Sequence, residues 1–268
     1  MRKLLLCPPD YYDIEYEINP WMSRARGADT ALVQKQWRGL YEKLLSLGCD
    51  VHLVPPRPKL PDMVFTANAG LTVGKKFILS NFRHKERAAE APYFAQWMEE
   101  QGYEVIWLPA DQFFEGEGDA LFAGDTLFCG YKFRTDVSAH RSVADILKCL
   151  VVSVELVDPR FYHIDTCFCP LSDGGAVWFP PAFDEYGQRA IRSHVPNLID
   201  VAEEEAARFS CNAVVLDQEI VLPEGAPKLM QSLGERGFHC HPLPMSEFLK
   251  AGGACKCLTM FMPQREKV

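Results

Sequence analysis

Apolar positions recur at helical spacing most clearly over residues 29–47. The apolar residues on this repeat are Leu32, Val33, Trp37, Leu40, Leu44 and Leu47. Asp29 or Thr30 before the repeat and Gly48 after it are typical of the two ends of a helix. We therefore predict a helix over 29–47. Residues 49–54 alternate between apolar and polar side chains before two prolines, and this pattern predicts a strand.

The same pairing of a helix with a following strand recurs along the chain. We predict helices over 85–101, 138–149, 184–194 and 227–236, and strands over 103–108, 151–157 and 238–242. Short strands are predicted over 77–80, 126–130, 176–179 and 213–216, and the apolar residues before Pro8 are interpreted as a first buried strand. About five such units favour a radial repeat that closes around a central channel. The glycine fingerprint of a dinucleotide-binding sheet is missing, which argues against nucleotide binding.

Composition narrows the class of protein. The chain has 268 residues, of which 48% are hydrophobic, and a net charge of −8 from 28 basic and 36 acidic residues. No run of Lys or Arg offers a surface for nucleic acid, and no segment approaches the ~18 apolar residues of a membrane span, so we expect a small-molecule substrate and neither nucleic-acid nor membrane partners. The ten cysteines, without a secretory signal, favour reduced thiols and a cytoplasmic location. We expect one domain over 1–268 and leave homo-oligomerisation open.

The segment 251–260 carries a candidate nucleophile. Two glycines precede Cys255 and Cys257, and Lys256 stands between the two thiols before a strand-like apolar stretch. A cationic neighbour lowers the pKa of a thiol, and the thiolate is the reactive form. We therefore expect a reactive Cys257, with Cys255 as a weaker candidate. The alternative is that both are small buried core residues.

Asp62, Phe65 and Asn68 fall within seven residues of one another on a predicted loop that enters a strand. An acid, an aromatic ring and an amide together suit a planar cationic ligand, which they can hydrogen-bond and stack against. The alternative is an Asx-turn at Asp62 and Asn68, with Phe65 in the core.

Three carboxylates, Glu115, Glu117 and Asp119, lie within five residues. Carboxylates held this close raise one another's pKa unless a cation sits among them, so the cluster indicates a bound cation or a role in proton transfer. The spacing does not fit a calcium loop, and a solvated turn is the alternative.

His163 and Asp165 lie two residues apart in an aromatic segment. In an extended segment both side chains would point to one face, which would place a proton-shuttling imidazole beside a cation-binding acid. A second interpretation gathers His163, Cys167, Cys169, residues 239–241 and Cys255 or Cys257 as zinc ligands. The CxC and HxH spacings are unusual for zinc, so we expect neither a metal nor a cofactor.

Together these motifs resemble the guanidino-group modifying enzymes, a superfamily that contains arginine deiminases, dimethylarginine dimethylaminohydrolases, amidinotransferases and arginine dihydrolases. The resemblance rests on Pro-Asp-x-Val-Phe at 61–65, Glu-Gly-x-Gly-Asp at 115–119, an arginine after Gly-Tyr at 130–134, His-x-Asp at 163–165 and Gly-Gly-x-x-x-Cys-Leu-Thr at 252–259. It covers nearly the whole chain. It implies a fivefold pseudosymmetric α/β propeller of ββαβ units, in agreement with the repeat pattern.

The resemblance also implies roles for individual residues. Cys257 matches the nucleophile, His163 the general acid/base, and Glu115 the acid that orients His163 or binds guanidinium. Because the acidic motif is one residue longer than in the deiminases, Glu117 is a rival to Glu115. The implied substrate-binding residues are Asn19, Asp62, Phe65, Asn68, Arg87, Arg134 and Asp165, with the two arginines on the α-carboxylate of the substrate.

Two positions choose within the superfamily. Asp165 follows His163 as in enzymes that act on arginine itself, whereas many dimethylarginine hydrolases lack an acid there. Asn68 stands where deiminases and dimethylarginine hydrolases carry an aspartate, and in this it resembles the arginine dihydrolases, which convert arginine to ornithine, two ammonia and carbon dioxide. The sequence thus favours an arginine dihydrolase. A deiminase or dimethylarginine hydrolase is the near alternative, and an amidinotransferase is a more distant one.

Overall fold

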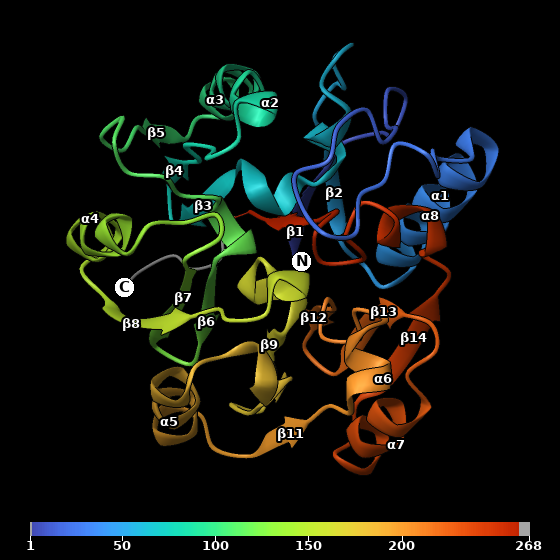
Figure 1. Cartoon of the computed structure of the whole chain (residues 1–268), viewed down its shortest axis with the longest axis vertical. Helices are drawn as coiled ribbons and strands as arrows, with labels where there is room; N and C mark the ends of the chain where they lie inside the picture. The colour runs from blue at the N-terminus through green and yellow to red at the C-terminus, as the bar shows by residue number, and fades with distance from the viewer. Residues whose placement is uncertain (1, 263–268) are drawn as a thin grey trace.

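Five three-stranded sheets are arranged around a common axis in the computed structural model, which describes residues 2–262 (Figure 1). In each sheet the inner strand pairs antiparallel with the middle strand, and the middle strand pairs parallel with the outer one. A helix connects the middle strand to the outer strand, as a parallel connection requires. The predicted fivefold α/β propeller of ββαβ units is confirmed.

The two ends of the described chain meet in the first sheet, where β15 pairs with β1 and so closes the ring. The sheets, from inner to outer strand, are β15 (Met260–Phe261), β1 (Lys3–Leu6) and β2 (Asp50–Leu53); β3 (Gly70–Val73), β4 (Lys76–Leu79) and β5 (Glu104–Ile106); β6 (Ala120–Ala123), β7 (Thr126–Tyr131) and β8 (Leu150–Glu155); β9 (Phe168–Pro170), β10 (Ala176–Trp178) and β11 (Leu198–Asp200); β12 (Val214–Leu216), β13 (Glu219–Pro223) and β14 (His239–Leu243).

The longer helices lie on the outside of the ring (Figure 1). The helices of the described chain are α1 (Thr30–Ser46), α2 (Lys85–Ala88), α3 (Ala91–Glu100), α4 (Val137–Leu147), α5 (Glu185–His194), α6 (Glu203–Ala206), α7 (Pro227–Glu235) and α8 (Ser246–Leu249). The helix predicted over 29–47 is confirmed as α1, with Asp29 accepting a hydrogen bond from the Leu32 amide as its N-cap. None of the helices within 2–262 is long and apolar enough to cross a bilayer.

The single helix predicted over 85–101 is wrong, because α2 ends at Ala88 and α3 begins at Ala91. Pro92 has no amide hydrogen to donate and lies in the first turn of α3, where a helix tolerates it. Glu90 lies in the break and turns its buried carboxylate onto Arg87. The sequence showed the apolar repeat but not this ion pair.

Short turns lead into the inner strand of every sheet, and they are called the lead-in turns here. They comprise the 3₁₀ helices Thr66–Ala69 before β3, Gly116–Gly118 before β6 and Ile164–Thr166 before β9, together with residues 209–213 before β12 and 254–259 before β15. Inner strands line the axis of the ring, so their lead-in turns converge at one end of it. Residues far apart in the sequence therefore meet there.

Candidate active site

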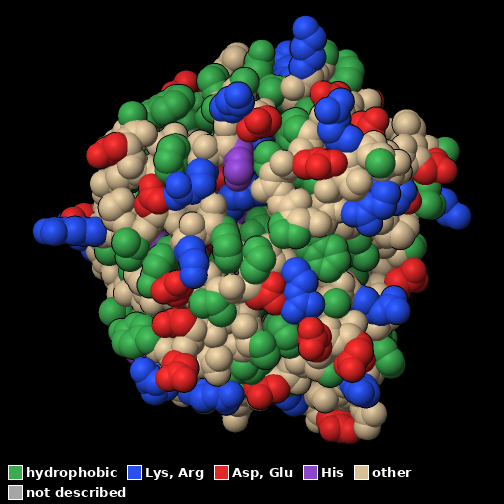
Figure 2. All heavy atoms as spheres, in the orientation of Figure 1, with side chains coloured by type: hydrophobic (Ala, Val, Ile, Leu, Met, Phe, Trp, Pro, Cys, Tyr) green, Lys and Arg blue, Asp and Glu red, His purple; other side chains and the backbone are tan. Residues whose placement is uncertain are grey.

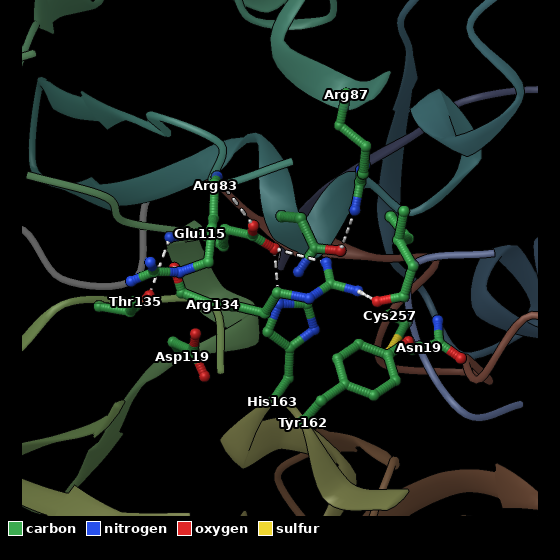
Figure 3. Close-up of polar contacts among 12 residues, drawn as sticks. Asn19, Arg83, Arg87, Glu115, Asp119, Arg134, Thr135, Tyr162, His163 and Cys257 are labelled. Carbon is green, nitrogen blue, oxygen red and sulfur yellow. Dashed lines mark hydrogen bonds and ion pairs between the residues drawn. The ribbon is translucent and has the colours of Figure 1, made fainter. Parts of the chain in front are cut away.

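Seven of the predicted site residues line a single cavity at this end of the ring. They are Asn19, Asp62, Phe65, Asn68, Arg87, Arg134 and Cys257, and Tyr162 lines the cavity with them. Glu115 and Asp165 contact this lining through Arg134 and Cys257, and His163 contacts Glu115. Figure 3 shows the side chains of Glu115, Arg134 and His163 facing one another beside Cys257. The fold thus brings all ten predicted residues together.

Cys257 is buried, and its sulfur has two polar neighbours. The Sγ atom lies 3.3 Å from Oδ2 of Asp165 and accepts a hydrogen bond from Nδ2 of Asn212 at 3.1 Å. Burial raises the pKa of the Cys257 thiol well above its ordinary value, and the neighbouring carboxylate of Asp165 raises it further. The free protein therefore holds Cys257 as a thiol.

Lys256 does not act on Cys257 as the sequence suggested. Its ammonium group is 2.8 Å from Oε2 of Glu117 and donates to the carbonyl of Thr259 at 3.0 Å. The expected lowering of the thiol pKa by Lys256 is therefore wrong, because the positive charge is compensated by Glu117 and the pKa of Cys257 is raised. Burial raises the pKa of Asp165 to about 7, against the opposing effect of Lys256.

His163 and Glu115 form a buried pair. Oε2 of Glu115 is 2.8 Å from Nε2 of His163 and accepts a hydrogen bond from Nη1 of Arg134 at 3.1 Å. Burial would raise the pKa of Glu115, but Arg134 and the hydrogen bond from His163 outweigh it and hold that pKa well below its usual range. Burial lowers the pKa of His163 to about 4, although Glu115 opposes this. The pair therefore consists of an ionised carboxylate and a neutral imidazole.

Glu115 immediately precedes the 3₁₀ helix Gly116–Gly118 and Glu117 lies within it, and the two carboxylates face different partners. Glu117 pairs with Lys256 and accepts the backbone amide of Phe261 at 3.2 Å, which ties the lead-in turn of β15 to that of β6. Glu115, in contrast, contacts His163 and Arg134. This geometry favours Glu115 over Glu117 as the acid that orients His163.

The extended conformation predicted for 163–165 is wrong. Residues Ile164–Thr166 form a 3₁₀ helix, in which the amide of Cys167 bonds to the carbonyl of Ile164 at 3.1 Å. The two side chains do not share one strand face. His163 turns to Glu115 and Asp165 turns to Cys257, so both still reach the site. Asp62 likewise lies in a 3₁₀ helix, Pro61–Val64, rather than in a loop that leads directly into a strand.

Arg87 and Arg134 are both buried and already engaged. Arg87 binds Glu90 through Nε and Nη2 at 2.9 and 2.8 Å and donates to Oδ1 of Asn68 at 2.8 Å. Arg134 donates to Glu115 and to the carbonyl of Ile18, and its guanidinium carbon lies 4.6 Å from the ring centre of Tyr162. Two of the five N–H groups of Arg134 are used in these hydrogen bonds, so it retains donors for an anion.

Asn68 lies between the arginine and the histidine. Its Oδ1 is taken by Arg87, whereas its Nδ2 is buried without a hydrogen-bond partner among residues 2–262. A Cβ atom placed on Gly118 would be 2.1 Å from this Nδ2 and 3.3 Å from Cγ of His163. Gly118 is thus required for the approach of Asn68 to His163.

Phe65 and Asn19 shape the cavity. Phe65 packs on Gly253, where a Cβ atom would lie 2.5 Å from the ring. Asn19 donates to the carbonyl of Ala251 at 3.0 Å and accepts the amide of Trp21 at 2.9 Å, so its side chain ties the segment before α1 to the turn that bears Cys257.

Zinc finds no support within 2–262, where no group of three or more His, Cys, Asp and Glu side chains could hold a metal ion. His239 and His241 instead both pair with Glu219 on the neighbouring strand β13. None of the ten cysteines, all of which lie within 2–262, forms a disulfide there.

Two polar residues of the site were missed by the sequence analysis. Tyr162 donates its hydroxyl to the carbonyl of Gly252 at 2.7 Å and carries Arg134 on its ring. Asn212 contacts the sulfur of Cys257. Asn212 belongs to no motif that we singled out, and only its position before the predicted strand 213–216 could have drawn attention to it.

A family model described as N,N dimethylarginine dimethylhydrolase, eukaryotic, matches residues 18–262. The bifunctional arginine dihydrolase/ornithine cyclodeaminase ArgZ of Synechocystis sp. is 47% identical over 96% of this chain and 37% of its own length. Its counterpart AgrE of Nostoc sp. is 46% identical over 99% of this chain and 39% of its own length. The chain therefore spans less than two fifths of these relatives. The N(G),N(G)-dimethylarginine dimethylaminohydrolase of Mycobacterium tuberculosis is 39% identical over 97% of this chain and 85% of its own length.

The fold matches solved structures over nearly its full length. The N-terminal domain of ArgZ, described as an arginine dihydrolase from the ornithine-ammonia cycle in cyanobacteria, superposes with a TM-score of 0.96 at 45% identity, covering 99% of this chain and all of that domain. In that structure a cysteine-to-serine variant is bound to substrate. An asparagine-to-serine variant of the same domain, with a TM-score of 0.97 at 44% identity over all of both chains, is covalently bonded to a reaction intermediate.

Proposed function

The chain belongs to the dimethylarginine dimethylaminohydrolase family of the guanidino-group modifying superfamily, and from this membership we propose that it is a cysteine-dependent arginine dihydrolase. The overall reaction is arginine plus two water molecules to ornithine, carbon dioxide and two ammonia. The single observation that carries the proposal is the arrangement of Cys257, Asp165, His163 and Glu115 around one buried cavity, with a neutral Asn68 beside the histidine.

The relatives support this choice of substrate. The portion of ArgZ that this chain matches is its N-terminal domain, which is described as the arginine dihydrolase. The proposal concerns that activity alone, since the chain spans 37% of ArgZ. Substrate and product are bound in structures of that domain.

The carboxylate of Asp165 would hold the guanidinium of arginine against the sulfur. A guanidinium carries only donors and a positive charge, so it can hydrogen-bond an acid and offset the negative charge beside Cys257. The thiol proton, disfavoured on sulfur once the cation arrives, passes to the neutral His163. Cys257 then attacks the guanidino carbon and forms a covalent amidino-thioether.

His163 would act as both acid and base. As His163⁺, which Glu115 stabilises, it gives its proton to the departing ammonia, and as neutral imidazole it then takes a proton from the water that attacks the thioether. Arg134, which retains free donors and lines the cavity, would hold the α-carboxylate of the substrate. Arg87 would fix Asn68 and Asp62 in addition to lining the cavity.

Asn68 would permit the second hydrolysis. Its Oδ1 is held by Arg87, so the group it has left is the N–H₂ of Nδ2. A ureido product, unlike arginine, has a carbonyl oxygen that can accept from such a donor. An aspartate at this place would instead favour a cationic guanidinium over a neutral ureido group. The ureido intermediate is therefore retained for a second attack by Cys257.

Dimethylarginine hydrolysis is the second candidate, because the family model and the relative from M. tuberculosis carry that description. It would use the same nucleophile and histidine. Asp165 argues against it, since methyl groups on the guanidino nitrogens would remove donors that a carboxylate at that place accepts.

Incubation with L-arginine, followed by identification of the products, tests the proposal. We expect ornithine and two ammonia per arginine consumed, without an added amine acceptor. Formation of citrulline with the release of one ammonia would show that the chain is a deiminase and not a dihydrolase. Turnover of asymmetric dimethylarginine in the absence of arginine turnover would favour the second candidate.

A further inference from the structure

We propose that Asn212 is a catalytic residue of this chain, which donates a hydrogen bond to the reacting sulfur and fixes the turn that presents it. The inference deepens the proposed function, on which it rests for the identity of Cys257 as nucleophile.

Both polar atoms of the Asn212 side-chain amide contact the lead-in turn of β15, and the nitrogen also contacts the lead-in turn of β9. Nδ2 donates to Sγ of Cys257 at 3.1 Å and to the carbonyl of Asp165 at 3.0 Å. Oδ1 accepts the backbone amides of Ala254 at 3.1 Å, Lys256 at 3.0 Å and Cys257 at 3.1 Å. The side chain is fully buried, so water does not compete for these bonds.

The place of Asn212 in the fold supports a role in the site. It lies in the lead-in turn of β12, two residues before that strand, as Asn68 lies two residues before β3. Among the other lead-in turns, that of β6 carries Glu117, that of β9 carries Asp165 and that of β15 carries Cys257, and Glu115 and His163 each lie one residue before the first two of these turns. Asn212 is thus the contribution of the fifth sheet to the same end of the ring.

The chemistry of the contact explains why an amide is needed there. A hydrogen bond to an ionised acceptor is stronger than one to a neutral acceptor, so the Nδ2 donor stabilises a thiolate more than a thiol. Asp165 acts in the opposite direction, because its carboxylate lies 3.3 Å from the same sulfur. A carboxylate at position 212 could keep the backbone contacts but would have no donor for sulfur.

The pKa of Cys257 responds to Asp165 and Asn212 in these opposite directions. Burial raises the pKa of the thiol, Asp165 raises it further, and the hydrogen bond from Asn212 lowers it. Asn212 therefore opposes burial and Asp165, which both favour the protonated sulfur.

The test compares Asn212→Asp and Asn212→Ser with the wild type. The readouts are the pH dependence of iodoacetamide alkylation at Cys257, located by peptide mass spectrometry, and kcat and KM for arginine. We expect the alkylation profile of both variants to move to higher pH, and kcat to fall by about tenfold or more with a smaller change in KM.

Gln36→Ala is the matched control for stability. Gln36 is also a buried amide, which donates to Ser246 and accepts the backbone amide of Glu247, and it lies on α1 away from the cavity. We expect this variant to keep the wild-type alkylation profile. If the Asn212 variants keep the wild-type profile, or lose activity only in proportion to unfolding as the control does, the inference is overturned.

A wild-type measurement covers the case in which both variants fail to fold. With ¹⁵N-labelled asparagine, one side-chain amide should titrate together with Cys257 and change on its alkylation; the absence of any such amide would overturn the inference. Because alkylation of Cys257 needs no substrate, it tests the role of Asn212 separately from the proposed function. If the alkylation profiles shift as expected but the wild type leaves arginine intact, the proposed function is contradicted and the role of Asn212 is supported.

Discussion

Nε2 of His163 lies 2.8 Å from Oε2 of Glu115, and both groups are buried. Because Glu115 is ionised, Nε2 carries the hydrogen and Nδ1 is the nitrogen left with a lone pair. The contact thus fixes both the tautomer and the orientation of the ring. It connects two sheets of the ring, since Glu115 precedes β6 and His163 precedes β9.

Replacement of Cys257 by Ala should lower kcat for arginine by at least about a thousandfold, because the covalent step is lost. Cys255→Ala is the control. Cys255 is buried in the same turn and the same apolar cluster as Cys257 but does not line the cavity, so its loss should cost about 1 kcal/mol of stability and leave kcat nearly unchanged. Equal losses of activity in the two variants would contradict the assignment of the nucleophile.

Substitutions of Glu115 and Glu117 should have different effects on activity and stability. Glu115→Gln should lower kcat by about a hundredfold, because the imidazolium form of His163 loses its ionised partner. Glu117→Gln should chiefly reduce stability, by about 3 kcal/mol, since it leaves the buried ammonium of Lys256 without its carboxylate. Activity per folded molecule and urea unfolding, measured on both variants, distinguish the two effects. A catalytic loss confined to Glu117→Gln would reverse the roles.

Asn68→Asp should convert the product from ornithine to citrulline, because a second carboxylate favours the cationic substrate over the neutral ureido intermediate. The measurement is the ratio of ammonia released to arginine consumed, which should fall from two toward one. If the variant still releases two ammonia, the role given to Asn68 is wrong.

Gly118→Ala should have a related effect without a change of charge. The added Cβ would lie 2.1 Å from Nδ2 of Asn68, so the amide must move away from position 118. We expect citrulline to appear beside ornithine. Gly39→Ala on α1 is the control, because nothing lies within 4 Å of a Cβ at that position. An unchanged product ratio in Gly118→Ala would show that the position of Asn68 does not control the second step.

The lowered pKa of His163 predicts how stability depends on pH. The pKa is about 4 in the folded chain and 6.5 ordinarily, so between these values the unfolded chain binds more protons. This contribution to stability is fully present above about pH 6.5 and is lost as the pH falls toward 4. Urea unfolding of the wild type and His163→Asn across this range checks the sign. Relative to the variant, the wild type should gain stability as the pH rises. A difference in free energy of unfolding that stays constant with pH would refute this prediction.

Much of the fold followed from the sequence alone. Helical spacing over 29–47 and the recurrence of helix and strand are local properties, and each of the five units repeats them because each must bury one face of a small sheet. The break at Glu90 and the turn at 164–166 were missed. Both depend on partners, Arg87 in one case and the converging lead-in turns in the other, that local periodicity does not register.

For the site, the sequence determined the residue types and the tertiary structure decided their pairing. The motifs identified Cys257, His163 and the acidic cluster, because chemistry restricts which side chains can do this work. They did not decide between Glu115 and Glu117, they assigned Lys256 to the wrong neighbour, and they omitted Asn212. A side chain's partner depends on how five distant turns meet at one axis, and the electrostatic effect of a charge depends on the distance and burial that only this meeting fixes.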